Sequence, residues 1–181
     1  YPSLLELVSF NPAEGWVANP SFAWTKKLDT TSSGRRSISI APTLRYGFSN
    51  KHFNAHLTVG YTYGKKYATT ITFSGGSRVF QFNNNSPIGQ RGNTISCLFS
   101  EENRIKSYEA VYFRGSFRKG IGNGFTFYTG FQYQDRKPLN NTTNYTWRDK
   151  PNREYTPNYP DELVSANIKR HQVFMATIGM N

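Results

Sequence analysis

The sequence predicts an all-β protein whose strands form an antiparallel up-and-down meander with two long loops. Three observations support this fold class. About seven segments of roughly ten residues alternate apolar and polar side chains, which is the period of a strand with one buried face. Short connections rich in Asn and Gly separate several of these segments, as hairpin turns require. Aromatic residues make up 16% of the chain, nearly all of them Tyr and Phe, which favour strands.

Each predicted strand follows from its alternation. The clearest segment is "HFNAHLTVGYTY", in which Phe53, Leu57 and Val59 share one parity while Asn54 and His56 take the other. The same period predicts strands over residues 16–28, 35–48, 52–63, 66–75, 109–119 and 125–135, with a weaker one over 167–180.

The connections between these segments come in two sizes. The connections at 48–52, 63–66 and 119–124 are tight, and the one at 28–36 is intermediate. Two connections are long, from Gly76 to about Ser107 and from about Arg136 to Ala166.

The first long connection is expected to hold a short helix over 94–100. The second is expected to be irregular, because Pro138, Pro151, Pro157 and Pro160 exclude strand or helix from much of it. The up-and-down pair 109–119 and 125–135 brings the ends of both loops to one edge of the sheet, so we expect the loops to pack on one another there. Their packed surface is predicted to be functional, or to plug a lumen, because long loops in compact domains usually bind or gate something. The candidate residues of this loop surface are Asn83, Asn84, Asn85, Tyr145, Trp147, Tyr155 and Tyr159.

Two architectures are compatible with the alternation. A soluble sandwich buries one face of each strand, whereas a membrane barrel turns its apolar face to lipid and keeps a polar lumen. The long strands, the aromatics near strand ends and the Thr-, Ser-, Gly- and Asn-rich second face favour the membrane barrel. The chain has no run of about 18 apolar residues, so the sequence predicts no transmembrane helix.

In this interpretation, alternate residues along each strand face the lipid and the lumen. Apolar residues such as Leu57 and Phe113 are expected to face outward. The candidate lumen residues have the opposite parity: Arg45, His56, Arg114, Arg118 and Gln132.

The basic charge restricts the partners. The formal net charge is +11, which suits anionic lipid, an anionic solute or nucleic acid. The cations are dispersed in pairs, mainly at strand ends, such as Lys65-Lys66 and Arg118-Lys119. Such pairs favour anchoring at anionic headgroups, so we expect outer-membrane lipid and other outer-membrane or periplasmic proteins as partners, and no nucleic acid.

Nothing in the sequence predicts an enzyme. His52 and His56 lie about 13 Å apart along an extended strand, too far to ligate one metal directly. No Ser occupies a Gly-x-Ser-x-Gly elbow, and Cys97 is the single cysteine and an expected apolar plug residue. We therefore expect no catalytic residue, no metal site and no cofactor.

Several short motifs of the chain resemble a known family in their order and spacing. They are Gly75-Gly76, Gln81-Phe82-Asn83, Glu102-Asn103, Tyr108-Glu109, Arg136-x-Pro138-Leu139 leading into Asn141-Thr142-Thr143, and Tyr155-Thr156-Pro157-Asn158 with Pro160. The resemblance is to the barrel region of large outer-membrane proteins of Bacteroidetes-type, Gram-negative bacteria. That family carries an N-terminal carboxypeptidase-regulatory-like domain and has no agreed activity.

The resemblance implies a location and a fold. It places the protein in the bacterial outer membrane and makes 1–181 a single segment of a β-barrel domain, a fragment without the N-terminal periplasmic domains and the closing strands. The expected function is then that of an outer-membrane β-barrel segment with a structural, transport or assembly role. The alternative is a soluble basic β-sandwich that binds carbohydrate or nucleic acid.

Overall fold

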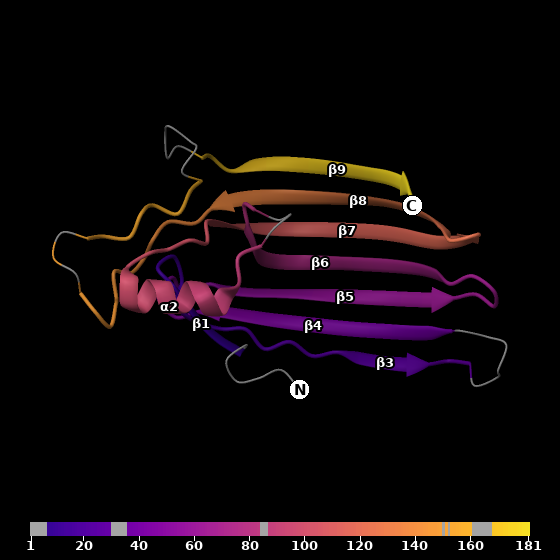
Figure 1. Ribbon diagram of the computed structural model, residues 1–181, viewed down its shortest axis with the longest axis horizontal. Helices are drawn as coiled ribbons and strands as arrows, with labels where there is room; N and C mark the ends of the chain where they lie inside the picture. The colour runs from indigo at the N-terminus through magenta and orange to yellow at the C-terminus, as the bar shows by residue number, and fades with distance from the viewer. Residues whose placement is uncertain (1–6, 30–35, 84–86, 150, 152, 161–167) are drawn as a thin grey trace.

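A computed structural model describes residues 7–29, 36–83, 87–149, 151, 153–160 and 168–181. In this part of the chain the strands form one antiparallel sheet of nine members, in the order β1-β2-β4-β5-β6-β7-β8-β9, with β3 also paired to β4 (Figure 1). The elements are β1 (Val8–Asn11), β2 (Gly15–Ala18), β3 (Trp24–Lys27), β4 (Ser37–Gly47), β5 (Phe53–Tyr63), β6 (Thr69–Gln81), α2 (Gln90–Ser100), β7 (Ser107–Gly122), β8 (Phe125–Pro138) and β9 (His171–Met180). The predicted all-β, up-and-down fold is confirmed, and the sheet is open.

The predicted strand over 16–28 is broken into two. Its path is correct, because β2 and β3 both run along the same edge of β4, with an isolated bridge between Ser21 and Thr43. Pro20 lies at the break and has no N–H to contribute to the ladder, although its carbonyl accepts a hydrogen bond from Leu44 N at 2.9 Å. The break therefore follows from the proline.

Other boundaries also differ from the sequence prediction. Strand β8 continues to Pro138, a residue that was expected to exclude a strand, and β7 is longer than predicted at both ends. The Gly75-Gly76 pair does not end its strand, since β6 continues to Gln81 and pairs with β7 throughout. Gly76 has φ +131°, and a Cβ there would lie 2.2 Å from the carbonyl oxygen of Ala55, so glycine is required where β5 and β6 approach. The helix is longer than 94–100 and begins at Gln90.

The register gives the sheet one apolar face. Three rows cross the strands on this face: Pro42, Leu57, Gly75, Phe113, Tyr133 and Phe174; Ile40, Val59, Phe73, Gly115, Phe131 and Ala176; and Ile38, Tyr61, Ile71, Phe117, Thr129 and Ile178. The rings of Phe73 and Phe113 stack with centroids 6.2 Å apart, and Phe113 meets Phe131 at 5.7 Å. The aromatic side chains thus pack on each other within the face.

The buried core of the domain lies at one end of the sheet. There α2 lies against β1 and across the strand ends, beside the segment that follows β8 (Figure 1). Phe10, Cys97, Leu98 and Tyr155 form the buried cluster. No helix within the described ranges is long and apolar enough to cross a membrane.

Candidate functional site

The polar face of the sheet gathers all five candidate lumen residues. Arg45 pairs with Asn54, and His56 pairs with Thr43 and Gly76. Arg114 pairs with Gln132, and Arg118 pairs with Tyr128. These residues have the parity opposite to Leu57 and Phe113, so the predicted division of the strands into two faces matches the register. That the polar face lines a lumen stays a prediction.

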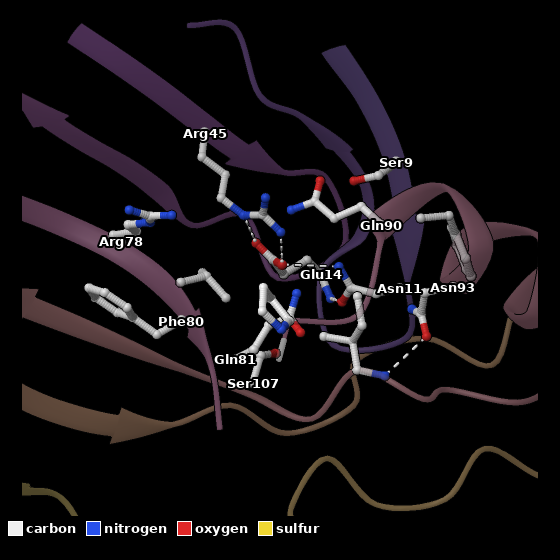
Figure 2. A pocket seen from close by; sticks show the side chains of 14 residues that line it. Ser9, Asn11, Glu14, Arg45, Arg78, Phe80, Gln81, Gln90, Asn93 and Ser107 are labelled. Atoms are coloured by element: carbon white, nitrogen blue, oxygen red, sulfur yellow. Dashed lines mark hydrogen bonds and ion pairs between the residues drawn. The ribbon is translucent and has the colours of Figure 1, made fainter. Parts of the chain in front are cut away.

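A cleft lies on the polar face, between the strands and the first turn of α2. It consists of two adjoining hollows of about 220 and 320 Å³, both lined by Arg45, Arg78 and Gln90. Figure 2 shows Arg45 and Arg78 reaching toward the smaller hollow from the sheet, while Gln90 enters from α2. The cleft brings together three parts of the chain: the sheet, the β1–β2 turn and the helix.

A buried ion pair closes one side of this cleft. Glu14 stands in the turn between β1 and β2 and its side chain is 1% exposed. It accepts hydrogen bonds from Arg45 Nε at 2.8 Å and Nη2 at 2.5 Å, and from Asn11 Nδ2 at 3.0 Å (Figure 2). The charge of Arg45 is therefore neutralised, and the β1–β2 hairpin is fixed to β4.

Arg78 differs from Arg45 in its charge partners. No hydrogen bond or ion pair joins it to any described residue, and its guanidinium carbon lies 5.3 Å from the ring centre of Phe80. Phe80 in turn contacts Tyr108 and Tyr112, which are buried. An aromatic platform thus carries a cation that the described chain leaves without a counterion.

Asn54 lies beside Arg78 in the larger hollow. It is 2% exposed, and its Oδ1 has no hydrogen-bond partner within the described chain. Its Nδ2 donates to Glu109 Oε2 at 3.5 Å, and the same oxygen lies 2.9 Å from His52 Nδ1. Among the described residues, the lining of this hollow therefore includes a buried acceptor without a donor and a cation without a counterion.

A separate hollow of about 490 Å³ lies outside the cleft, farther along the polar face over β7, β8 and β9. Arg114, Arg118 and Gln132 line it, and neither arginine has a hydrogen-bond or ion-pair partner within the described ranges. Arg118 is thus a cation of the same face that stands outside the cleft.

The two long loops pack on one another at the α2 end of the sheet, as predicted. Thr146 Oγ1 donates to the carbonyl of Leu98 at 2.8 Å, and Trp147 N donates to the same oxygen at 2.9 Å. The Trp147 ring meets Phe99 edge-on, with centroids 5.3 Å apart. Tyr155 is buried against Cys97, so the second loop covers the apolar side of the helix in the first.

The other candidate loop residues are distributed differently. Tyr145 is exposed, although its ring contacts Phe10 at 5.9 Å, and Tyr159 is half-buried. Asn83 is exposed after β6, away from the buried cluster. Asn84 and Asn85 lie outside the described residues. The contacts thus join Tyr145, Trp147 and Tyr155 to the packed surface, and a functional role for it stays a prediction.

Two asparagines that the sequence analysis did not single out hold the loop layer together. Asn93 Oδ1 accepts the backbone N–H groups of Arg104 at 2.8 Å and Ile105 at 3.0 Å. Asn158 bonds both backbone groups of Ser107, at 3.0 and 2.9 Å, and the carbonyl of Leu139 at 2.9 Å. Asn158 therefore bridges β7 and the chain that leaves β8.

Cys97 is an inert thiol in this layer. It is fully buried, and burial raises the pKa of its thiol to about 12, against a smaller opposing effect of the Asn93 hydrogen bond. Burial also raises the pKa of the Tyr155 hydroxyl. Within the described residues, no group of three or more His, Cys, Asp or Glu side chains is placed to hold a metal ion.

The sequence contained partial signals for the cleft. Asn54 and Arg45 were placed on the polar face by alternation alone. Arg78 was missed because the Gly75-Gly76 pair was interpreted as the end of a strand. If the strand is continued through the glycines, Arg78 has the parity of Ser74 and joins the same face.

Comparison with known proteins gives one match. A family model described as "Family of unknown function (DUF5686) C-terminal domain" matches residues 1–181. No curated protein and no solved structure matches the chain. The resemblance to a family without an agreed activity is confirmed at this level. Three parts of the resemblance stay predictions. They are the preceding carboxypeptidase-regulatory-like domain, the Bacteroidetes-type source, and the assignment of this chain to one segment of a larger barrel.

Proposed function

We propose that this chain, which belongs to the DUF5686 family and matches its C-terminal domain, forms part of the wall of a transmembrane β-barrel in the bacterial outer membrane. The polar face lines the lumen in this proposal, and the two packed loops cover it at one end as a plug. Outer-membrane lipid is then the first partner, with other outer-membrane or periplasmic proteins at the ends of the barrel.

The observation that carries the proposal is the uncovered apolar face. Phe73, Phe113 and Phe131 are between 41% and 48% exposed, and Phe174 and Ile178 reach 69% and 76%. In the described chain no second layer packs on these residues, because α2 and both loops contact the core at one end of the sheet. A face of this extent exceeds the apolar patches of soluble monomers and suits lipid.

The height of the apolar face also fits a membrane. Along β5 it runs from Ala55 to Tyr63, which spans about 27 Å of extended strand. Strands of membrane barrels tilt by about 35–45°, so this length corresponds to roughly 20 Å along the membrane normal, close to the apolar band of about 25 Å in outer-membrane barrels. Lys119 stands beside Thr69 at one border of the face. The positive charge of Lys119 therefore lies at the level where the lipid headgroups are expected.

The position of the arginines is consistent with the same orientation. Arg45, Arg78, Arg114 and Arg118 all have the polar parity. An arginine on the lipid side near the bilayer midplane costs about 2–4 kcal/mol, so segregation of these residues to the other face is what a barrel wall requires. Among structural, transport and assembly roles, a basic polar face favours transport or binding of anionic solutes.

The soluble-sandwich alternative requires that the apolar face be covered. A sandwich covers the apolar face with a second sheet about 10 Å away, and that face would then be inaccessible to lipid and to thiol reagents alike. Neighbouring positions on one strand therefore separate the two architectures, since adjacent side chains point to opposite faces.

The experiment uses single cysteines in the natural protein that carries this domain, assayed in isolated outer membranes. Thr58→Cys and Ser116→Cys are expected to react with a membrane-impermeant maleimide, whereas Leu57→Cys and Phe117→Cys are expected to react only with a lipid-soluble one. The buried Cys97 stays in place as an unreactive internal control. Reaction of Leu57→Cys with the impermeant reagent, or recovery of the protein in the soluble fraction without detergent, would contradict the proposal.

A further inference from the structure

We propose that the cleft between the polar face and the first turn of α2 binds a small anion that carries hydroxyl groups, in the class of sugar acids and sugar phosphates. The inference rests on the groups inside the cleft and does not depend on the membrane. It therefore goes beyond the proposed barrel wall and can fail separately from it.

The anionic part of the ligand follows from Arg78. Its neighbour Arg45 is neutralised by Glu14. The other carboxylate near the cleft, Glu109, bonds His52 and Asn54. Of the two arginines that line the cleft, Arg78 is the one without a carboxylate partner in the described chain. Its guanidinium lies over the Phe80 ring, and so it can present its N–H fork to a carboxylate or phosphate.

The hydroxyl part of the ligand follows from Asn54. A buried acceptor without a donor is costly, and most buried polar atoms in proteins have a partner. Asn54 and Arg78 both line the hollow of about 320 Å³, and Asn54 Oδ1 has no hydrogen-bond partner within the described chain. A ligand hydroxyl can donate to Oδ1 while an acidic group on the same molecule meets Arg78. An inorganic anion without hydrogen would satisfy only the arginine.

The rest of the cleft suits a molecule of monosaccharide size. The larger hollow is within the lower range of small-molecule sites, and the smaller one adjoins it. Thr43 and Ser21 offer hydroxyl groups to the larger hollow, and Asn19 and Gln90 offer amides. Neutral groups that both donate and accept hydrogen bonds are suited to several sugar hydroxyls.

Isothermal titration calorimetry on the detergent-purified natural protein tests the inference at about 0.15 M ionic strength, where the Debye length is about 8 Å. The probes are D-glucuronate, D-glucose 6-phosphate, neutral D-glucose and inorganic sulfate, which carries no hydrogen at neutral pH. We expect at least one of the two sugar anions to bind at least tenfold more tightly than both glucose and sulfate. Arg78→Gln is expected to weaken that binding about tenfold or more, the scale of one lost charge-assisted hydrogen-bond set.

The matched control is Arg118→Gln, which removes a cation of the same face that also has no partner among the described residues and lies outside the cleft. Arg118 is eight residues along β7 from Ala110, the strand partner of Arg78, which corresponds to about 27 Å. Binding should stay within about twofold of wild type in this variant, because Debye screening limits electrostatic effects over that distance. Equal losses in both variants would mean that diffuse positive charge attracts the probes, and the proposal would be wrong. Equal affinity for sulfate and for the sugar anions, or no binding of either sugar anion, would also overturn it. Arg78 is exposed, so its replacement is expected to leave folding intact.

Discussion

Tyr155 and Cys97 are joined by a hydrogen bond that connects the two long loops. The Tyr155 hydroxyl lies 2.7 Å from the carbonyl oxygen of Cys97 in α2 and 3.0 Å from that of Tyr145 in its own loop. The hydroxyl is buried, and so are the groups it contacts in the helix. The single hydroxyl hydrogen of Tyr155 is therefore shared between a carbonyl of the helix and a carbonyl of its own loop.

Removal of this hydroxyl is expected to loosen the loop layer. In Tyr155→Phe the Cys97 carbonyl loses its hydroxyl donor and keeps only the longer hydrogen bond from Glu101 N at 3.3 Å, at a cost of about 1 kcal/mol. The amide of Trp147, which bonds Leu98, should then exchange with solvent deuterium roughly tenfold faster, while amides of β7 should not change. Tyr159→Phe is the control, since the Tyr159 hydroxyl bonds no described residue. Unchanged exchange at Trp147 in Tyr155→Phe would show that the hydroxyl does not hold the layer.

The buried Glu14–Arg45 pair is predicted to be the most sensitive polar contact of the sheet. Glu14→Gln leaves the Arg45 charge partly buried without a counterion, which costs about 3–5 kcal/mol. We expect a matching decrease in the free energy of unfolding, measured by urea titration of the detergent-solubilised protein. The control is Glu102→Gln, whose ion pairs with Arg104 and Arg153 are both exposed and should contribute about 0–1 kcal/mol each. Equal effects of the two substitutions would contradict the importance assigned to burial.

The sequence predicted most of the sheet because local pattern and tertiary structure agree in its long strands. The alternation over 52–63 corresponds to β5 at Phe53–Tyr63, and the tight turns fix which strands are neighbours. It also predicted the end at which the two loops meet. A strand pair with a short turn returns the chain to the same edge, whatever the loops contain.

The remaining features depend on contacts between distant residues. Strand β1 has only four residues, too few for a visible period, and Phe10 N is held by Thr94 Oγ1, 84 positions away. Glu14 stands in a turn, and nothing local indicates that its carboxylate meets Arg45 of β4. The cleft could not be predicted for the same reason, since its walls come from the β1–β2 turn, β4–β6 and α2.

The Cys97 thiol is predicted to be unreactive in the folded protein. Its pKa is raised to about 12 by burial, so almost no thiolate exists at pH 8. Iodoacetamide should label Cys97 only after unfolding in urea, whereas Ile95→Cys, at an exposed position of the same helix, should be labelled in the folded state. The raised pKa also means that the folded state keeps a proton that the unfolded state releases above its own thiol pKa. This contribution to stability is therefore present below about pH 9 and is lost as the pH rises toward 12.

The last prediction compares two neighbouring residues on β5. Leu57 stands on the apolar face between Pro42 and Gly75, in the row next to that of Val59, and Thr58 stands on the polar face between Ala41 and Ser74. If the apolar face meets lipid, Leu57→Arg places a charge near the bilayer midplane and should destabilise the inserted state by about 2–4 kcal/mol. Thr58→Arg adds the same side chain to the face that already carries Arg45 and Arg114, and insertion should be unchanged. The folded fraction in vesicles, followed by heat-modifiable mobility on gels, measures both. If Thr58→Arg abolished insertion while Leu57→Arg had no effect, the lipid and lumen sides would have to be exchanged.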